Sequence, residues 1–447
     1  MPREYVKGET AAMAMVVKNN MSAKNTLNQL DKNNKAAAKD LKKIASGQKI
    51  NNAGDDASGL SISERMEVQI RSLDQDNANA QNGVSMLKTA EGAVQSTVDI
   101  LKTLKEKAIN AANDTNTDAD RATMQKEFDQ SIDQIDENAN QTYNGQYLVD
   151  GSKEHYVPDP GTFTSMTNET LSENTDEFTA LTDLKDSEGN SLLINTTDTM
   201  TVSYVMNGKT HTASVQVGEL DLGSIFPSTV GDEDIVLRPV DNTVGENEFG
   251  ETVYNASGRI ALTFMSQRPG VDNQIAGLTI TFQDRYGTQK RFANALFNNF
   301  HESVRAKDPS DDNSIDLQVG TKSNQSVRLG LTDMRARALG LRSSDGTTLS
   351  ITSQAKANAA INVLDNALQK ALDQQTDIGS VQSRLGFTSS NIVLASENTT
   401  NSMSVIRDAD MAAEMTAYTK DNVLQQAAQS MLAQANQSSS SVLSLLQ

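Results

Sequence analysis

The sequence contains no cysteine, no tryptophan and only three histidines among its 447 residues. Without cysteine, disulfides, thiolate zinc sites and cysteine nucleophiles are excluded. His155, His211 and His301 leave little material for metal or acid–base chemistry. No run approaches the roughly 20 apolar residues that a membrane-spanning helix requires, and residues 1–12 lack the apolar core of a Sec-type signal peptide.

Basic residues are scarce relative to acidic ones: 39 Lys and Arg stand against 58 Asp and Glu, a net charge of -19. A chain this acidic repels phosphate backbones and anionic headgroups. We therefore expect neither nucleic acid nor a membrane surface as a partner. We also expect no cofactor and no enzymatic activity, because the familiar catalytic motifs are missing or incomplete.

Two motifs resemble metal sites and fail at required positions. His301-Glu302 begins an HExxH zinc helix, but the second ligand position holds Arg305, so we interpret the pair as ordinary helix surface. Residues 114–120 have the acidic spacing of a calcium loop, yet the glycine and glutamate that it needs are Ala119 and Gln125. We interpret this segment as a solvated turn that caps the next helix. No metal site is expected.

Proline and aromatic residues are concentrated in one window. Residues 151–310 hold six of the seven prolines, 13 of the 19 aromatics and more than half of the net charge. Proline is excluded from helix interiors. The chain is therefore predicted to have long helices at both ends and a different, inserted region in the middle.

The terminal regions carry apolar residues at alternating spacings of three and four, the 3.5-residue period of a coiled-coil seam. Residues 70–101 and 361–392 carry this pattern, and a shorter amphipathic helix is expected through Phe128, Ile132 and Ile135. Asn20, Asn34 and Asn77 interrupt these seams; a register-fixing role and partial exposure at loosely packed positions both fit. We expect the two ends to pair with each other and the outermost helices to contact other molecules. The seam predicted to drive assembly comprises Leu27, Leu30, Leu41, Ile44, Leu424, Ala428, Met431 and Ala435.

The middle region has β-strand patterns. Residues 201–206 and 210–217 alternate around Asn207-Gly208, a strong hairpin signal. Strands are also expected at 259–266 and 277–282, and a hairpin at 316–331. Residues 291–305 are predicted to form a helix. Asp55 and Asp56 are expected to cap the helix that starts near Ala57.

Residues 13–30 (MAMVVKNNMSAKNTLNQL) and 44–66 (IASGQKINNAGDDASGLSISERM) resemble the N-terminal signature of bacterial flagellin. Residues 404–415 (SVIRDADMAAEM) and 431–446 (MLAQANQSSSSVLSLL) are similar to its C-terminal one, and residues 317–339 to the segment that returns to the helical core. The resemblance covers roughly the first 150 and the last 130 residues.

The resemblance implies a mainly α fold with an inserted β-rich domain. Its expected divisions are an N-terminal extension of doubtful origin (1–12), the two halves of an inner coiled-coil core (13–56 and 404–447), the two halves of an outer core (57–150 and 315–403) and a variable surface domain (151–314). Flagellins begin close to residue 13 of this sequence, so residues 1–12 are unexpected.

The resemblance also implies function. The expected role is that of an exported, extracellular subunit of the flagellar filament, a structural homopolymer used for motility. Expected partners are an export chaperone at residues 404–447 and the hook-associated junction and cap proteins. Alternatives are the hook–filament junction protein itself, or a flagellin whose middle domain adds an adhesive or proteolytic role.

Host innate receptors are further possible partners by resemblance. The helix surface that a Toll-like receptor senses aligns with residues 101–113, where Thr103 replaces an arginine and Lys107 replaces a leucine; Glu127 matches. These replacements imply weak activation. The C-terminal leucine motif that cytosolic receptors detect corresponds to Val442, Leu443, Leu445 and Leu446.

Overall fold

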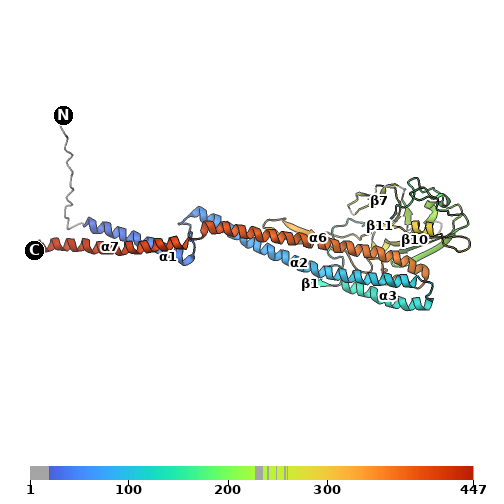
Figure 1. Cartoon of the computed structure of the whole chain (residues 1–447), viewed down its shortest axis with the longest axis horizontal. Helices are drawn as coiled ribbons and strands as arrows, with labels where there is room; N and C mark the ends of the chain where they lie inside the picture. The colour runs from blue at the N-terminus through green and yellow to red at the C-terminus, as the bar shows by residue number, and fades with distance from the viewer. Residues whose placement is uncertain are drawn as a thin grey trace, which may run out of the picture. The chain divides into compact units, whose positions relative to one another are not determined.

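The computed structural model describes residues 20–226, 235–238, 241–247, 249–255, 258 and 260–445 (Figure 1). The chain divides into two compact units. We call residues 1–76 with 390–447 the terminal unit, and residues 77–389 the central unit. The extension at 1–12 lies outside the described residues. No helix in the described part of the chain is both long and apolar enough to cross a membrane.

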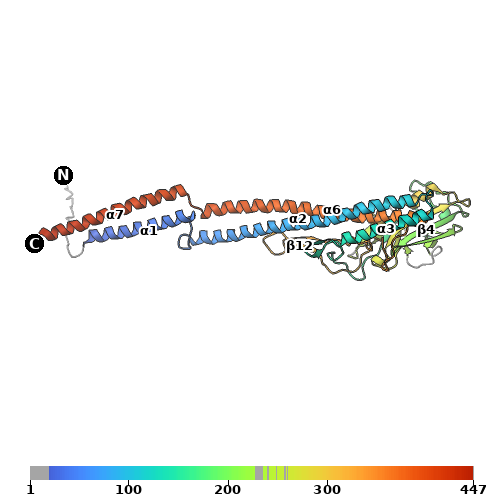
Figure 2. The same cartoon turned by 90° about the horizontal axis from the view of Figure 1, so that it is seen from below.

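The terminal unit is helical, as predicted. It contains α1 (Met21–Ser46), α7 (Met411–Leu445), the start of α2 (Ala57–Ala111) and the end of α6 (Gln354–Arg407). The α1 and α7 helices lie side by side and antiparallel (Figures 1 and 2): Asn20 at the start of α1 donates to the Ala435 carbonyl, and Lys43 near its end pairs with Glu414 at 2.9 Å. The two ends of the chain therefore pair with each other.

Local polar groups set the helix ends. Asn20 accepts a hydrogen bond from Ala23 N, which satisfies one of the unpaired donors of the first turn of α1. The Asp56 carboxylate accepts from the backbone N–H groups of Ser58 and Gly59, so it caps α2 as predicted. These bonds, led by that of Gly59, lower the pKa of Asp56. Asp55 does not cap α2; its carboxylate accepts from the Asn51 and Asn52 N–H groups in the preceding turn.

The central unit is built on three helices. The rest of α2 packs with α6 and with α3 (Asp118–Ala139), whose first turn is closed by the Thr117–Asp120 capping box. The predicted registers are confirmed by burial: Leu87, Leu101, Phe128, Ile132, Ile135, Leu364 and Leu385 are fully buried. The acidic turn at 114–120 is a helix cap, as expected.

In the part of the central unit that the structure describes, the strands form two small sheets and three two-stranded hairpins. One sheet has the order β10-β4-β5 and the other β11-β3-β9-β6, and the neighbouring strands in both are antiparallel. A second hydrophobic core, which includes Tyr204, Phe264, Phe282 and Phe297, lies in this β-rich region. The strands are β1 (Thr142–Tyr143), β2 (Gln146–Tyr147), β3 (Ser165–Asn168), β4 (Thr199–Met206), β5 (Lys209–Gln216), β6 (Ile235–Leu237), β7 (Thr243–Glu246), β8 (Thr252–Tyr254), β9 (Leu262–Ser266), β10 (Ile275–Gln283), β11 (His301–Val304), β12 (Ile315–Gln318) and β13 (Ser326–Leu329).

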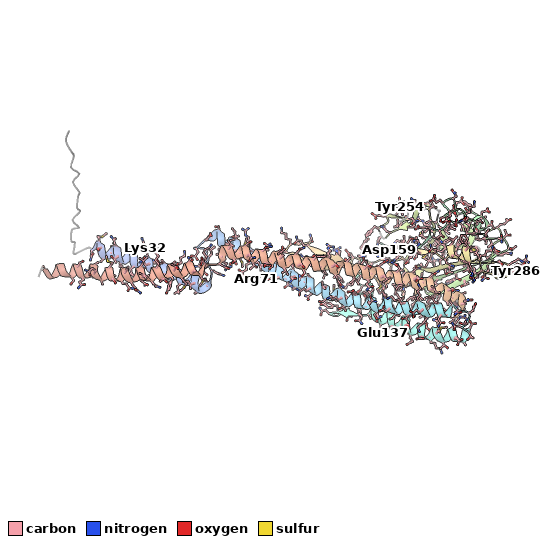
Figure 3. The ribbon with its side chains drawn as sticks, viewed as in Figure 1. Lys32, Arg71, Glu137, Asp159, Tyr254 and Tyr286 are labelled. Atoms are coloured by element: carbon pink, nitrogen blue, oxygen red, sulfur yellow. The ribbon has the colours of Figure 1, made fainter. Side chains whose placement is uncertain are left out.

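The inserted region enters and leaves side by side. Val157 and Ser310 form an antiparallel bridge, and Thr162 and Lys307 form another. These contacts give the insertion a paired stem. Its outward side chains include Tyr254 and Tyr286, which are 62% and 80% exposed (Figure 3).

The predicted hairpins are confirmed, whereas the helix predicted at 291–305 is wrong. Only α5 (Arg291–Phe297) is helical; residues 301–304 form β11, which pairs with β3. His301-Glu302 therefore lies on a strand and not on a helix surface. Glu302 is almost fully buried and pairs with Lys370 at 3.2 Å, so it has a structural partner that the sequence pattern did not indicate.

The β4–β5 turn fits closely against a neighbouring loop. Gly208 has φ +65°, and a Cβ there would lie 2.5 Å from Ser343 N. We expect Gly208→Ala to lower the free energy of unfolding by about 2 kcal/mol or more, since the left-handed backbone alone costs about 1–2 kcal/mol. Gly287→Ala is the matched control, because Gly287 has φ +83° with open space around it. Denaturant unfolding compares the two; equal losses would refute the close fit.

Candidate assembly interface

The structure divides the predicted α1 seam into an inner and an outer row. Ala37 is buried, and Ala23, Leu30 and Ile44 are half-buried. The outer row is only partly covered: Leu27 and Leu41 are 54% and 50% exposed, and the exposed Asn34 between them accepts a hydrogen bond from Gln425 of α7. Each row repeats every seven residues, so one helix carries two faces. Among the described residues, the inner face is the more fully covered of the two.

The same division occurs on α7. Ala428 and Ala435 are buried, at 8% and 9% exposure, whereas Leu424 and Met431 are 41% and 61% exposed. Met415, Val423 and Leu424 line a shallow groove on the outside of α7. Of the eight predicted seam residues, the structure therefore leaves Leu27, Leu41, Leu424 and Met431 about half exposed.

The described part of the terminal unit exposes more large apolar side chains than it buries. Its buried apolar residues are Ala37, Ile50, Leu73, Ile392, Ala428 and Ala435. Its exposed ones are Met21, Leu27, Leu41, Ile62, Val68, Val393, Leu394, Val405, Met411, Met415, Val423, Leu424 and Met431. Contiguous exposed apolar surface on a protein marks an interaction site. The predicted seam did not include Val68, Val405, Met411 and Met415, which the structure also exposes. In the sequence, these residues are apolar but lie outside the seven-residue repeat of the seam.

Polar groups line the edges of the α1–α7 contact. Lys43 pairs with Glu414 across the two helices and lies 3.9 Å from Asp40. Burial raises the pKa of Asp40, and the nearby carboxylates of Glu414 and Asp421 add to that effect against the opposing Lys43. Charged residues away from the contact, such as Lys32 and Arg71, point outward (Figure 3).

The three seam asparagines are polar links and not fully buried residues. Asn20 donates to Ala435 O, Asn34 accepts from Gln425, and Asn77 accepts from Ser389 Oγ at 2.6 Å. None is classed among the buried residues, so partial exposure describes all three. Each still forms a hydrogen bond to the opposing helix, and this bond favours one axial alignment of the two helices.

Asp76 on α2 is a buried acid with one carboxylate oxygen that has no hydrogen-bond partner. It is 5% exposed, and the oxygen without a partner is Oδ2. Burial raises its pKa. Below pH 3.8, the ordinary pKa of this carboxyl, Asp76 is protonated in both the folded and the unfolded state. As the pH rises through the raised pKa, the folded state must hold a buried charge, which lowers the free energy of unfolding.

We therefore expect Asp76→Asn to raise the free energy of unfolding at pH 7 by about 1 kcal/mol, because it removes a buried unpaired charge. The difference from wild type should vanish below about pH 4. Urea unfolding at pH 3 and pH 7 measures both values. Asp74→Asn is the control, since Asp74 is exposed; a gain for Asp76→Asn that is the same at both pH values would contradict this account.

The residues aligned with the innate-receptor surface lie on α2 and α3 of the central unit. Thr103 is exposed and donates through its hydroxyl to Asp99 O at 3.0 Å. Lys107 and Glu127 form an ion pair at 2.5 Å between the two helices. Glu127, which matches the family pattern, is thus paired with Lys107, which departs from it.

The C-terminal leucine motif lies at the end of α7, which continues to Leu445. The side chains of Val442, Leu443 and Leu445, and Leu446 altogether, fall outside the described residues. Their role remains a prediction.

Models of a known protein family match both ends of the chain. Models of the bacterial flagellin N-terminal and C-terminal helical regions match residues 17–154 and 361–446. The chain is 34% identical to flagellin from Clostridium tyrobutyricum, over 95% of this chain and 99% of the relative. It is 26% identical to flagellin from Bacillus subtilis (strain 168), over 97% and 100%.

Similar solved structures include FliC from Burkholderia pseudomallei, with 17% identity, 68% of this chain and 99% of that chain covered, and a TM-score of 0.26. The flagellar junction protein FlgL from Legionella pneumophila shows 16% identity, 72% and 99% coverage, and a TM-score of 0.30. The assignment comes from the sequence matches, which reach both ends and extend over nearly the whole length of the relatives. This chain belongs to the bacterial flagellin family.

Proposed function

We propose that this chain is a flagellar filament subunit that polymerises through the outer faces of α1 and α7. The observation that carries the proposal is the excess of exposed over buried large apolar residues in the terminal unit. Full burial of one Leu or Met side chain contributes about 1.5–3 kcal/mol, and association costs about 4–15 kcal/mol in lost freedom of motion. Burial of half of the exposed set by neighbouring subunits would offset that cost.

The outer faces lie on different helices, so a subunit can contact different neighbours with each. A head-to-tail contact that does not close gives an open helical polymer. The inner and outer core divisions at 13–56, 57–150, 315–403 and 404–447 are part of this proposal. Its role is structural rather than enzymatic, in keeping with family membership.

Seeded polymerisation of the purified chain, viewed by electron microscopy, tests the proposal. We expect long filaments of uniform diameter, which disappear when residues 1–50 or 405–447 are removed. Short structures that add to filament ends and do not elongate would instead assign the chain to the hook–filament junction.

Export and partners belong to the same proposal. We infer from family membership that the chain leaves the cell, and from the few large side chains buried in its terminal unit that its ends order on assembly outside it. An export chaperone would cover the apolar face of residues 404–447 before that step. Hook-associated junction and cap proteins would contact the two ends of the filament.

We further infer that host Toll-like receptor activation by this flagellin is weak. Lys107 places a charge, paired with Glu127, where strongly recognised members have an apolar contact. We expect potency in a reporter-cell assay to be about tenfold or more below that of a strongly recognised flagellin. The double variant Thr103→Arg with Lys107→Leu should recover potency. Equal potency of the unmodified chain would overturn the inference.

A further inference from the structure

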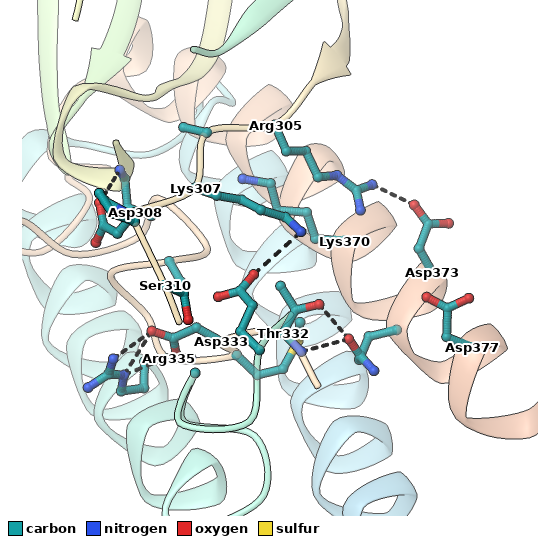
Figure 4. Close-up of a pocket in the computed structure, with 18 residues that line it drawn as sticks. Arg305, Lys307, Asp308, Ser310, Thr332, Asp333, Arg335, Lys370, Asp373 and Asp377 are labelled. Atoms are coloured by element: carbon teal, nitrogen blue, oxygen red, sulfur yellow. Dashed lines mark hydrogen bonds and ion pairs between the residues drawn. The ribbon is translucent and has the colours of Figure 1, made fainter. Parts of the chain in front are cut away.

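A cavity of about 190 Å3 lies in the central unit, where α6 faces the stem of the inserted region (Figure 4). It is lined by both charge signs, and its cations already have partners. Arg305 pairs with Asp373 at 2.5 Å, and Lys307 lies 3.5 Å from Glu154. The cavity therefore offers no concentrated positive charge for a phosphate or a dianion.

One buried group in its wall lacks a partner. Gln374 is 3% exposed, and its Nε2 donates to no group in the structure. Its Oε1 accepts from the Thr332 backbone N–H at 3.0 Å and from the Thr332 hydroxyl at 2.6 Å. The backbone N–H can only donate, which fixes the orientation of the amide. A buried donor without an acceptor costs about 1–3 kcal/mol, so the site calls for an acceptor from outside the chain.

A second group lies one helical turn further along α6. Asp377 also lines the cavity, and its carboxylate is exposed and forms no ion pair with a described residue. Residues three apart on a helix share a face. The cavity thus presents an unmet amide donor inside and an unpaired carboxylate at its exposed edge.

We propose that this cavity binds a small zwitterionic amino acid. The ligand carboxylate accepts from Gln374 Nε2, and its ammonium group pairs with Asp377. An engineered cavity of about 150 Å3 holds benzene, so about 190 Å3 admits molecules of the size of alanine or serine. A neutral sugar would satisfy Gln374 and leave Asp377 without a cation.

Titration calorimetry on the full-length monomer tests the proposal with alanine, serine, N-acetylalanine, alanine methyl ester and glucose. We expect alanine and serine to bind at millimolar concentration. N-acetylalanine lacks the ammonium group and the ester lacks the carboxylate, so each should bind about tenfold more weakly. Binding of glucose alone, or of none of these compounds because water fills the cavity, would overturn the proposal.

Two variants separate the contacts. Gln374→Glu keeps the oxygen that accepts from Thr332 and removes the Nε2 donor, and we expect it to weaken alanine binding about tenfold or more. Asp377→Asn should weaken alanine and leave N-acetylalanine unchanged. Gln81→Glu makes the same charge change at an exposed site on α2 and should have no effect. Thermal unfolding confirms that each variant is folded; unchanged alanine binding by a folded Gln374→Glu protein refutes the assignment.

Discussion

The double substitution Leu27→Asp with Leu41→Asp is expected to abolish seeded polymerisation while leaving the folded monomer intact. Both side chains are about half exposed and belong to the outer row of α1. In a filament each would have to bury a carboxylate against apolar neighbours, at a cost of several kcal/mol per site. Losses of that size, added over two sites in every subunit contact, exceed the net stability of a typical association.

Sedimentation assays after seeding, with electron microscopy of the pellet, measure the effect. The thermal unfolding of the central unit should remain at the wild-type temperature, which separates a failure to assemble from a failure to fold. Leu193→Asp is the control, because Leu193 is a 71% exposed leucine in the inserted region; that variant should polymerise. Normal filaments from the double variant would show that the outer row of α1 is not a subunit contact.

The second large effect is expected from Phe128→Ala in α3. Phe128 is fully buried in the core that α2, α3 and α6 share. Replacing a buried phenylalanine by alanine removes its transfer free energy and leaves a cavity, which costs about 3–5 kcal/mol. A loss of this size removes a large share of the stability of an average domain.

Urea unfolding followed by circular dichroism gives the free energy directly. Phe387→Ala is a matched control on α6 of the same unit, since that ring is 75% exposed, and it should change the free energy by less than about 0.5 kcal/mol. If the two alanine variants were equally stable, the core assigned to α3 would be incorrect.

Local patterns predicted the helices and hairpins well because their causes are local. The alternation around Asn207-Gly208 predicted β4 and β5, and the cap at Asp56 predicted the start of α2. The helix predicted at 291–305 ends at Phe297, and residues 301–304 instead form β11, which pairs with β3. That strand is more than 130 residues away, and its hydrogen bonds leave no signal in the local sequence.

The interface was predicted only in part for a similar reason. A seven-residue repeat identifies which residues are apolar, but Leu27 and Leu30 cannot be assigned to an inner or an outer face until the position of α7 is known. The cavity beside Gln374 was not predicted at all. Its lining comes from the stem, the segment after β13 and α6, which meet only through the fold.

The paired stem at Val157–Ser310 and Thr162–Lys307 brings the two ends of the inserted region next to each other. A graft with closely spaced ends can therefore replace its outward loops, provided that it keeps β10, whose Ala276 and Leu278 carbonyls accept from Asn366 and Asn362 of α6. The length and chemistry of the displayed surface can therefore change from one variant to another while the polymer lattice stays the same. A peptide grafted at this point would be presented once per subunit, at a spacing that the lattice dictates.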